Sequence, residues 1–376
     1  MKRTVCFLLV ILLAAMPLLV GSAAEEKAYV LLEATTGTVI ESSNEEEQLP
    51  VAGLVKLMSC LVIYDALESG AISAGDSVTI SEGAHSKGGV RVFLDAGATY
   101  TVEELLKPAA MCGANDAITA LAEHIAGSEA GFVERMNQRA AELGLGCTFV
   151  DCTGLSEGNR MSAYDCAIIG AALSQHSSYF KYSGIWMDTF THESGRETEL
   201  ANANKLVKTE GFDGMITGST SASGYSLVSS YKTGGARYIC VVIGDNNTDD
   251  RFTLAREKTL AAAGQYAVRQ IAQKGAKVTT VELKGAPDGE LELYAGEDFA
   301  LLLEKTAEST MKKEVQVDEG LTLPLAAGDV AGKLVVTLGD GRQESVDLVV
   351  REDVEERSFQ RSLLQILSLW LHGGAA

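Results

Sequence analysis

The chain has few positive charges for its size. Its 376 residues hold 31 Lys and Arg against 51 Asp and Glu, which gives a net charge of −20. Nucleic-acid binding needs a basic face, so this balance argues against a DNA- or RNA-binding protein. The same balance gives the chain no general electrostatic attraction to anionic lipid.

Metal-binding patterns are lacking as well. The cysteines show no zinc-type spacing, and we expect neither a metal nor a cofactor. Six of the seven lie beyond residue 24: Cys60, Cys112, Cys147, Cys152, Cys166 and Cys240. An even number in an exported chain permits disulfides, and Cys147 with Cys152 is the nearest pair. Because the cysteines are scattered through apolar segments, buried free thiols are the favoured interpretation.

Residues 1–24 have the pattern of a secretory signal peptide. Lys2 and Arg3 form a basic start, residues 5–20 an apolar run, and Ser22-Ala23-Ala24 a small-residue cleavage site. The alternative is an uncleaved anchor, but the run is short for a membrane-spanning helix. We therefore expect a secreted, extracytoplasmic protein.

The stretch that begins at Pro50 predicts the start of a buried helix that runs to about Ser69. Apolar residues recur there at helical spacing: Leu54, Leu57, Met58, Leu61 and Val62. Lys56 lies inside this apolar run, and burying an ammonium costs several kcal/mol unless the group is paired or used. Lys56 is therefore a candidate functional residue; the alternative is a lysine whose stem packs while its head reaches water.

The order of the predicted elements indicates an α+β fold. Residues 28–41 predict a β-hairpin, 224–243 a second strand pair, and about 55–200 a mostly helical region. Residues 250–274 predict one long amphipathic helix, and residues 76–80 and 87–94 two short extended pieces. Short strands then predict a small β-sandwich at 291–294, 299–302, 314–317, 333–338 and 345–350.

The C-terminal residues 355–372 have the pattern of an amphipathic helix with a wide apolar face that ends at Trp370 and Leu371. With no chain left to pack against it, this face favours an interfacial helix on a membrane surface. Docking on the β-module or on a partner protein is the alternative.

Several segments carry a resemblance to a known family: residues 121–128, 151–155, 162–165 and 202–206. Over about residues 26–350 the chain resembles the low-molecular-weight penicillin-binding proteins, which are serine-type D-alanyl-D-alanine carboxypeptidases. The resemblance implies a penicillin-binding/β-lactamase-like transpeptidase fold, with an antiparallel sheet and a helical subdomain that flank an active cleft.

The first family motif is Ser-x-x-Lys, in which the serine is the nucleophile and the lysine takes its proton. Lys56 stands at the lysine position, and Gly53 stands at the serine position. Glycine has no side chain that could attack a carbonyl, so an acyl-enzyme cannot form there. A substitute nucleophile from Cys60 or Cys112 is disfavoured.

The second and third family motifs are altered too. Ser-x-Asn reads Gly113-Ala114-Asn115, which keeps the asparagine that would bind substrate and loses the serine that relays protons. Lys-Thr-Gly reads Ile216-Thr217-Gly218, which loses the cation that would pair with the substrate carboxylate, worth roughly 2–3 kcal/mol for a charged hydrogen bond. Thr217 and Gly218 remain as candidate substrate-binding residues.

These observations predict four parts: a signal peptide at 1–24, a carboxypeptidase-like domain at 25–275, a β-sandwich domain at 276–352 and a C-terminal amphipathic helix at 353–376. The favoured interpretation is a cell-wall-associated pseudoenzyme that binds a peptidoglycan stem peptide or a partner without cleaving it. One alternative is an active carboxypeptidase that trims peptidoglycan pentapeptides. Another is a structural scaffold of the envelope.

Overall fold

The computed structural model describes residues 28–287, 289–306 and 311–356. The predicted signal peptide and residues 357–376 of the predicted C-terminal helix lie outside these ranges. None of the helices in the described ranges has the length and apolar character needed to cross a membrane.

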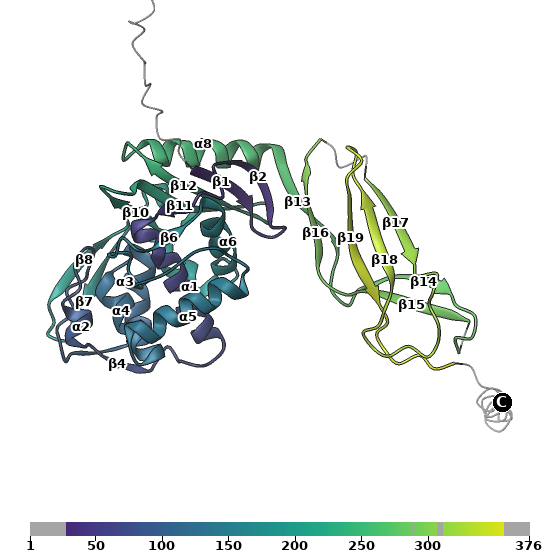
Figure 1. The fold of residues 1–376 in the computed structure, drawn as a ribbon, viewed down its shortest axis with the longest axis horizontal. Helices are drawn as coiled ribbons and strands as arrows, with labels where there is room; N and C mark the ends of the chain where they lie inside the picture. Colours follow the sequence, from purple (N-terminus) through teal and green to yellow (C-terminus); the bar gives the residue numbers. More distant parts are fainter. Residues whose placement is uncertain (1–27, 288, 307–310, 357–376) are drawn as a thin grey trace, which may run out of the picture.

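The first part of the chain is built on a six-stranded antiparallel sheet (Figure 1). The strands run in the order β10-β11-β12-β1-β2, and β9 also pairs with β11. Their bounds are β1 (Ala28–Glu33), β2 (Thr38–Ser43), β9 (Phe212–Gly214), β10 (Thr217–Thr220), β11 (Gly224–Thr233) and β12 (Ala236–Asp245). Adjacent residues of a strand face opposite sides, so Leu31 packs toward helix α8 (Asp250–Gln265) whereas Leu32 packs toward the helical region.

The helical region surrounds α1 (Lys56–Glu68), which follows the 3-10 helix η1 (Ala52–Val55). Ten of the thirteen α1 residues are buried, as expected of a central helix that is apolar all round. Around it lie α2 (Glu82–His85), α3 (Val102–Cys112), α4 (Asn115–Ala126), α5 (Glu129–Glu142), α6 (Ala163–Leu173), η2 (Ser177–Tyr179), α7 (Phe180–Ser183) and η3 (Lys205–Lys208). Three two-stranded sheets complete it: β3 (Leu49–Pro50) with β6 (Arg160–Met161), β4 (Ser77–Thr79) with β5 (Thr99–Thr101), and β7 (Met187–Thr191) with β8 (Glu197–Ala201).

Local sequence signals explain where several of these helices begin. Thr101 caps α3, and its side chain accepts a hydrogen bond from the Glu104 backbone while Glu104 bonds back, as the capping-box pattern predicts. Ser128 caps α5 through its side chain, which accepts a hydrogen bond from the Gly131 backbone without a capping box. Gly70, with φ 74°, lies just past the C-terminus of α1.

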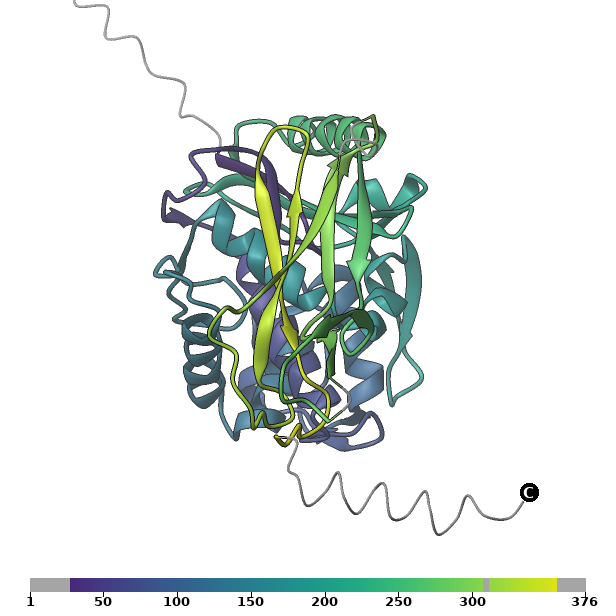
Figure 2. The same cartoon turned by 90° about the vertical axis from the view of Figure 1, so that its right-hand side faces the viewer.

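The last part of the chain is β-rich, and Figure 2 views the molecule from its side. Its strands are β13 (Tyr266–Ala272), β14 (Lys277–Glu282), β15 (Glu290–Ala295), β16 (Phe299–Glu304), β17 (Lys312–Val317), β18 (Val330–Thr337) and β19 (Gln343–Val349). Five of them form a sheet in the order β14-β15-β19-β18-β17, and β13 pairs with β16. The five strands predicted in this region are confirmed.

Two predicted elements are wrong. The helix predicted over 250–274 ends at Gln265, because residues 266–272 form β13 and pair with β16. Tyr266, Val268 and Ile271 favour a strand, and that pairing overrides the helical spacing. Residues 87–94 form no strand; they are a loop that packs on the start of α4.

Candidate active site

Three segments that are distant in the sequence meet at the N-terminus of α1. Lys56 Nζ donates hydrogen bonds to the Gly113 carbonyl at 2.9 Å and to Asn115 Oδ1 at 3.1 Å. A Cβ built on Gly53 would lie 3.0 Å from the Thr217 carbonyl oxygen of β10. The structure therefore brings together all three motif positions that the sequence identified.

Gly53 lies in η1, directly after Ala52, whose φ is 44°. A positive φ at a non-glycine residue costs about 1–3 kcal/mol and is concentrated at functional sites. The chain thus keeps a strained backbone just before the position of the family nucleophile, although Gly53 presents no side chain. Ser59, one turn beyond Lys56 in α1, is no substitute, because it is buried and its hydroxyl donates to the Cys152 carbonyl at 2.6 Å.

Lys56 is a buried cation, with 6% of its surface exposed. Burial disfavours the charged form and lowers the pKa of its ammonium to about 8. No carboxylate among the described residues forms a salt bridge with it, so its hydrogen-bond partners are the neutral oxygens of Gly113 and Asn115. Lys56 therefore loses its proton at a lower pH than an exposed lysine does, but position 53 has no side chain for it to activate.

Gly113 ends α3 in the left-handed region, with φ 65° and ψ 45°. A Cβ there would lie 3.2 Å from Lys56 Nζ, so the ammonium closely approaches the space of the lost serine. Both the backbone conformation and the space now suit glycine.

Asn115 is 2% exposed, and both ends of its amide are bonded within the protein. Its Oδ1 accepts from Lys56, and its Nδ2 donates to the Gly88 carbonyl at 2.8 Å. Asp116, which sequence reasoning missed, is also buried and accepts hydrogen bonds from the backbone amides of Val92 and Leu94. These contacts hold the loop of residues 87–94 over Asn115.

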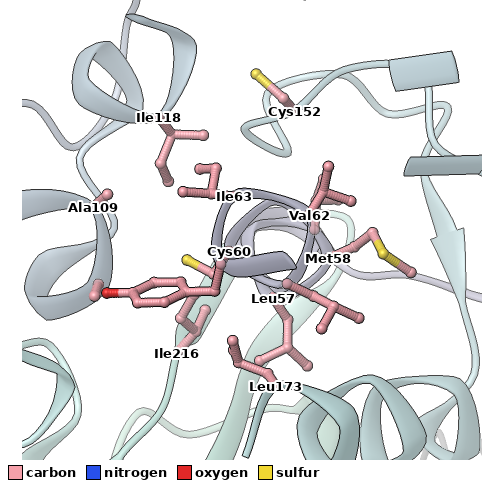
Figure 3. Close-up of a cluster of buried hydrophobic side chains, with 14 of the residues drawn as sticks. Leu57, Met58, Cys60, Val62, Ile63, Ala109, Ile118, Cys152, Leu173 and Ile216 are labelled. Atoms are coloured by element: carbon pink, nitrogen blue, oxygen red, sulfur yellow. The ribbon is translucent and has the colours of Figure 1, made fainter. Parts of the chain in front are cut away.

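Ile216 occupies the third-motif lysine position and is 4% exposed. It belongs to the main hydrophobic core, and Figure 3 shows it among the buried side chains around α1. The carbonyl of Gly218, two residues on, accepts a hydrogen bond from Arg251 Nη1 at 3.1 Å. Arg251 is buried, and sequence reasoning missed it because it lies at the start of α8, 33 residues away.

The nearby cysteines are not activated thiols. Burial raises the pKa of Cys60 to about 12 and that of Cys112 to about 11. The Cys112 thiol donates to the Pro108 carbonyl at 3.2 Å. All six cysteines in the described ranges are free thiols, and four of them are buried.

The space between the three segments is small. A cavity of about 20 Å³ is lined by Lys56, Met111, Cys112, Gly113, Asn202, Ala203, Asn204, Met215, Ile216 and Thr217. That volume holds about one water molecule. The described ranges contain no cluster of three His, Cys, Asp or Glu residues that could hold a metal ion.

An antiparallel sheet, a buried helix that begins at Lys56, and Asn115 at the second motif position define the fold of the D-Ala-D-Ala carboxypeptidase class. The family model described as D-alanyl-D-alanine carboxypeptidase matches residues 17–247, so the chain belongs to this family. A second model, the C-terminal domain of penicillin-binding protein 5, matches residues 266–356.

Individual relatives agree with this placement. The chain is 34% identical to the D-alanyl-D-alanine carboxypeptidase DacF of Bacillus subtilis over 352 residues, which cover 93% of this chain and 90% of the relative. Penicillin-binding protein 5 of Haemophilus influenzae is a structural neighbour with a TM-score of 0.80 and 31% identity, covering 88% of this chain and 97% of that one. Penicillin-binding protein 6B of Escherichia coli matches with a TM-score of 0.70 and 27% identity, covering 86% and 94%.

Proposed function

We propose that this chain is a non-catalytic member of the D-alanyl-D-alanine carboxypeptidase family. The observation that carries the proposal is the pairing of Gly53 with Lys56: the family's proton acceptor is in place, and there is no side chain from which it could take a proton. In other serine hydrolases, removing one member of such a catalytic unit costs on the order of a million-fold in rate.

The main alternative is an active carboxypeptidase with relocated groups. It would need a hydroxyl or thiol near Lys56 that could become a nucleophile. Ser59 is buried and bonded to a backbone carbonyl, and the pKa of Cys112 is raised rather than lowered. Neither side chain therefore has the properties of a nucleophile that could replace the missing serine.

The ligand of such a protein is a stem peptide or a protein partner. Two features favour a partner that binds outside the family cleft. The cavity beside Lys56 has a volume of about 20 Å³, far below the roughly 300–1,000 Å³ of common ligand pockets. Asn115, the substrate-binding candidate, already uses both ends of its amide. We therefore place the chain in the cell envelope as a binding or scaffold protein.

The domain organisation is part of the proposal. We assign the signal peptide to residues 1–24, and we propose a boundary before the β-rich domain at about 266 in place of 276; the pairing of β13 with β16 supports this change. The C-terminal helix remains a proposed contact with the membrane surface.

Covalent labelling tests the loss of catalysis. The purified chain is incubated with a fluorescent penicillin and separated on a denaturing gel, with an active relative as the control. We expect no labelled band. A band would contradict the proposal, and its loss in Cys112→Ala would identify a relocated thiol nucleophile.

Stem-peptide binding has a separate test. Equilibrium dialysis with a radiolabelled pentapeptide that ends in D-Ala-D-Ala measures retention without requiring cleavage. We expect no saturable binding at millimolar peptide. Saturable binding that Asn115→Ala removes would favour the stem peptide over a protein partner.

A further inference from the structure

The β-rich domain contains a groove of about 520 Å³, far larger than the cavity beside Lys56. Its lining residues are Gln270, Ile271, Ala272, Gln273, Ala276, Lys277, Val278, Thr279, Lys313, Glu314, Val315 and Leu334. A volume of this size falls within the range of common ligand sites, roughly 300–1,000 Å³. No part of the carboxypeptidase-like cleft lies in this lining.

The groove lies beside the two edge strands of one sheet, and residues 270–272 of β13, which belongs to the separate β13–β16 pair, also line it. In the order β14-β15-β19-β18-β17, the strands β14 and β17 are the two ends, yet residues of both line the groove. Within the described ranges β17 pairs only with β18, and β14 only with β15. Each of these two strands therefore leaves one backbone edge unpaired beside the groove.

The hydrogen-bond pattern shows which backbone groups β17 leaves unpaired. Asp318 N donates to the Ala331 carbonyl, and the β17–β18 register continues from there without a shift. Because bonded pairs alternate along an antiparallel ladder, Glu314 and Gln316 bond toward β18. Lys313 and Val315 then direct their backbone N–H and C=O toward the groove. On β14 the register shifts between Lys277 and Thr279, so β17 is the more regular edge.

The groove opens onto the hydrophobic core of this domain. Ile271, Val278 and Val315 are only partly buried, and each packs against the core cluster that includes Leu334. An extended segment in the groove could bury these side chains with every second residue of its own. Addition of a strand to a free edge combines such contacts with main-chain hydrogen bonds.

The charge of the lining indicates the kind of segment. The groove lining carries Lys277, Lys313 and Glu314, and adjacent residues of β17 face opposite sides, so the side chains of Lys313 and Glu314 do not share a face. Lys277 binds Glu292 on β15, whereas Lys313 forms no ion pair with any described residue. We propose that the groove between β14 and β17 binds an extended acidic segment of a partner protein, which adds as a strand to β17. This inference names a partner surface for the proposed non-catalytic protein but does not depend on the loss of catalysis.

The test uses the full chain and a fluorescein-labelled decapeptide that alternates glutamate and valine. Fluorescence anisotropy gives its Kd. A second decapeptide has the same sequence with an N-methyl group on every residue, which removes the main-chain donors of both strand edges. We expect the first peptide to bind and the second not to bind, because strand addition needs those donors.

Lys312 and Lys313 give a matched pair of variants. Both side chains are exposed and neighbouring, but only Lys313 lines the groove. We expect Lys313→Glu to raise the Kd about fivefold or more, and Lys312→Glu to change it less than about twofold. Thermal unfolding of both variants confirms that they fold.

Four results would overturn the proposal. They are no binding of the unmethylated decapeptide, equal binding of the methylated one, equal effects of the two lysine variants, or competition by a synthetic peptide of residues 357–376. The last result would assign the groove to the chain's own tail. The penicillin-labelling experiment is independent, so failure here leaves the proposed loss of catalysis intact.

Discussion

Restoring the first-motif serine alone is not expected to restore catalysis. In Gly53→Ser, the new Cβ lies 3.0 Å from the Thr217 carbonyl oxygen and 3.3 Å from both the Gly218 Cα and the Lys56 Cε. These distances are tight, so the backbone of β10 must yield by a few tenths of an ångström. We expect overpacking of this kind to lower the free energy of unfolding by about 1–3 kcal/mol.

The variant would have a nucleophile beside a proton acceptor. With a pKa of about 8, Lys56 is neutral in about one-tenth of molecules at pH 7. The serine of the second motif, absent at Gly113, contributes roughly 10²–10⁴-fold if it acts as a general acid–base group. The cation absent at Ile216 contributes roughly 2–3 kcal/mol of binding. Together the two losses leave Gly53→Ser at least about a thousand-fold below an active relative.

The assay is the single-turnover rate of acylation by a fluorescent penicillin, with Gly53→Ala as the control for packing. D-alanine release from a D-Ala-D-Ala tripeptide is measured in parallel. Acylation within tenfold of an active relative would refute the reasoning, because it would make the second and third motif positions dispensable.

Three further predictions concern stability and reactivity. Because burial lowers the Lys56 pKa from 10.5 to about 8, the unfolded chain binds more protons between these values. As pH rises through that window, the free energy of unfolding of the wild type should therefore rise by up to about 3 kcal/mol relative to that of Lys56→Met. Urea unfolding measures both values, and an equal pH dependence of the two proteins would contradict this prediction. Ile216→Lys buries a second ammonium beside Lys56, so its free energy of unfolding in urea should be about 3 kcal/mol or more below that of Ile216→Met. A difference under about 1 kcal/mol would contradict the assignment of position 216 to the core. Since burial raises the pKa of Cys112 to about 11, its thiol should react with Ellman's reagent much more slowly in the native chain than in the denatured chain, and equal rates would show an exposed thiol.

Local patterns predicted much of the fold. The capping box at Thr101 and Glu104 and the turn between β11 and β12 depend on neighbouring residues, so the sequence alone specifies them. Residues 266–272 were mispredicted because pairing with β16, more than 25 residues away, decides their conformation. Helical spacing cannot distinguish that outcome from a continued helix.

The candidate site was predictable in part. The family resemblance predicted that Gly53, Lys56, Gly113 and Ile216 are close together, and the geometry agrees. The resemblance gave no indication that both ends of the Asn115 amide are hydrogen-bonded within the protein. Nor did it indicate that Asp116 holds the loop of residues 87–94 over Asn115. Those contacts join residues more than 20 positions apart through backbone groups, which leave no signature in side-chain patterns.

The most direct test of the account is hydrolysis by the unmodified protein. The purified chain is incubated with a peptide that ends in D-Ala-D-Ala, and released D-alanine is followed over hours against a buffer blank and an active relative. The absence of a nucleophile at Gly53 predicts release no faster than in the blank. Release of D-alanine at a rate that scales with protein concentration would contradict the proposed loss of catalysis, although the description of the fold would be unaffected.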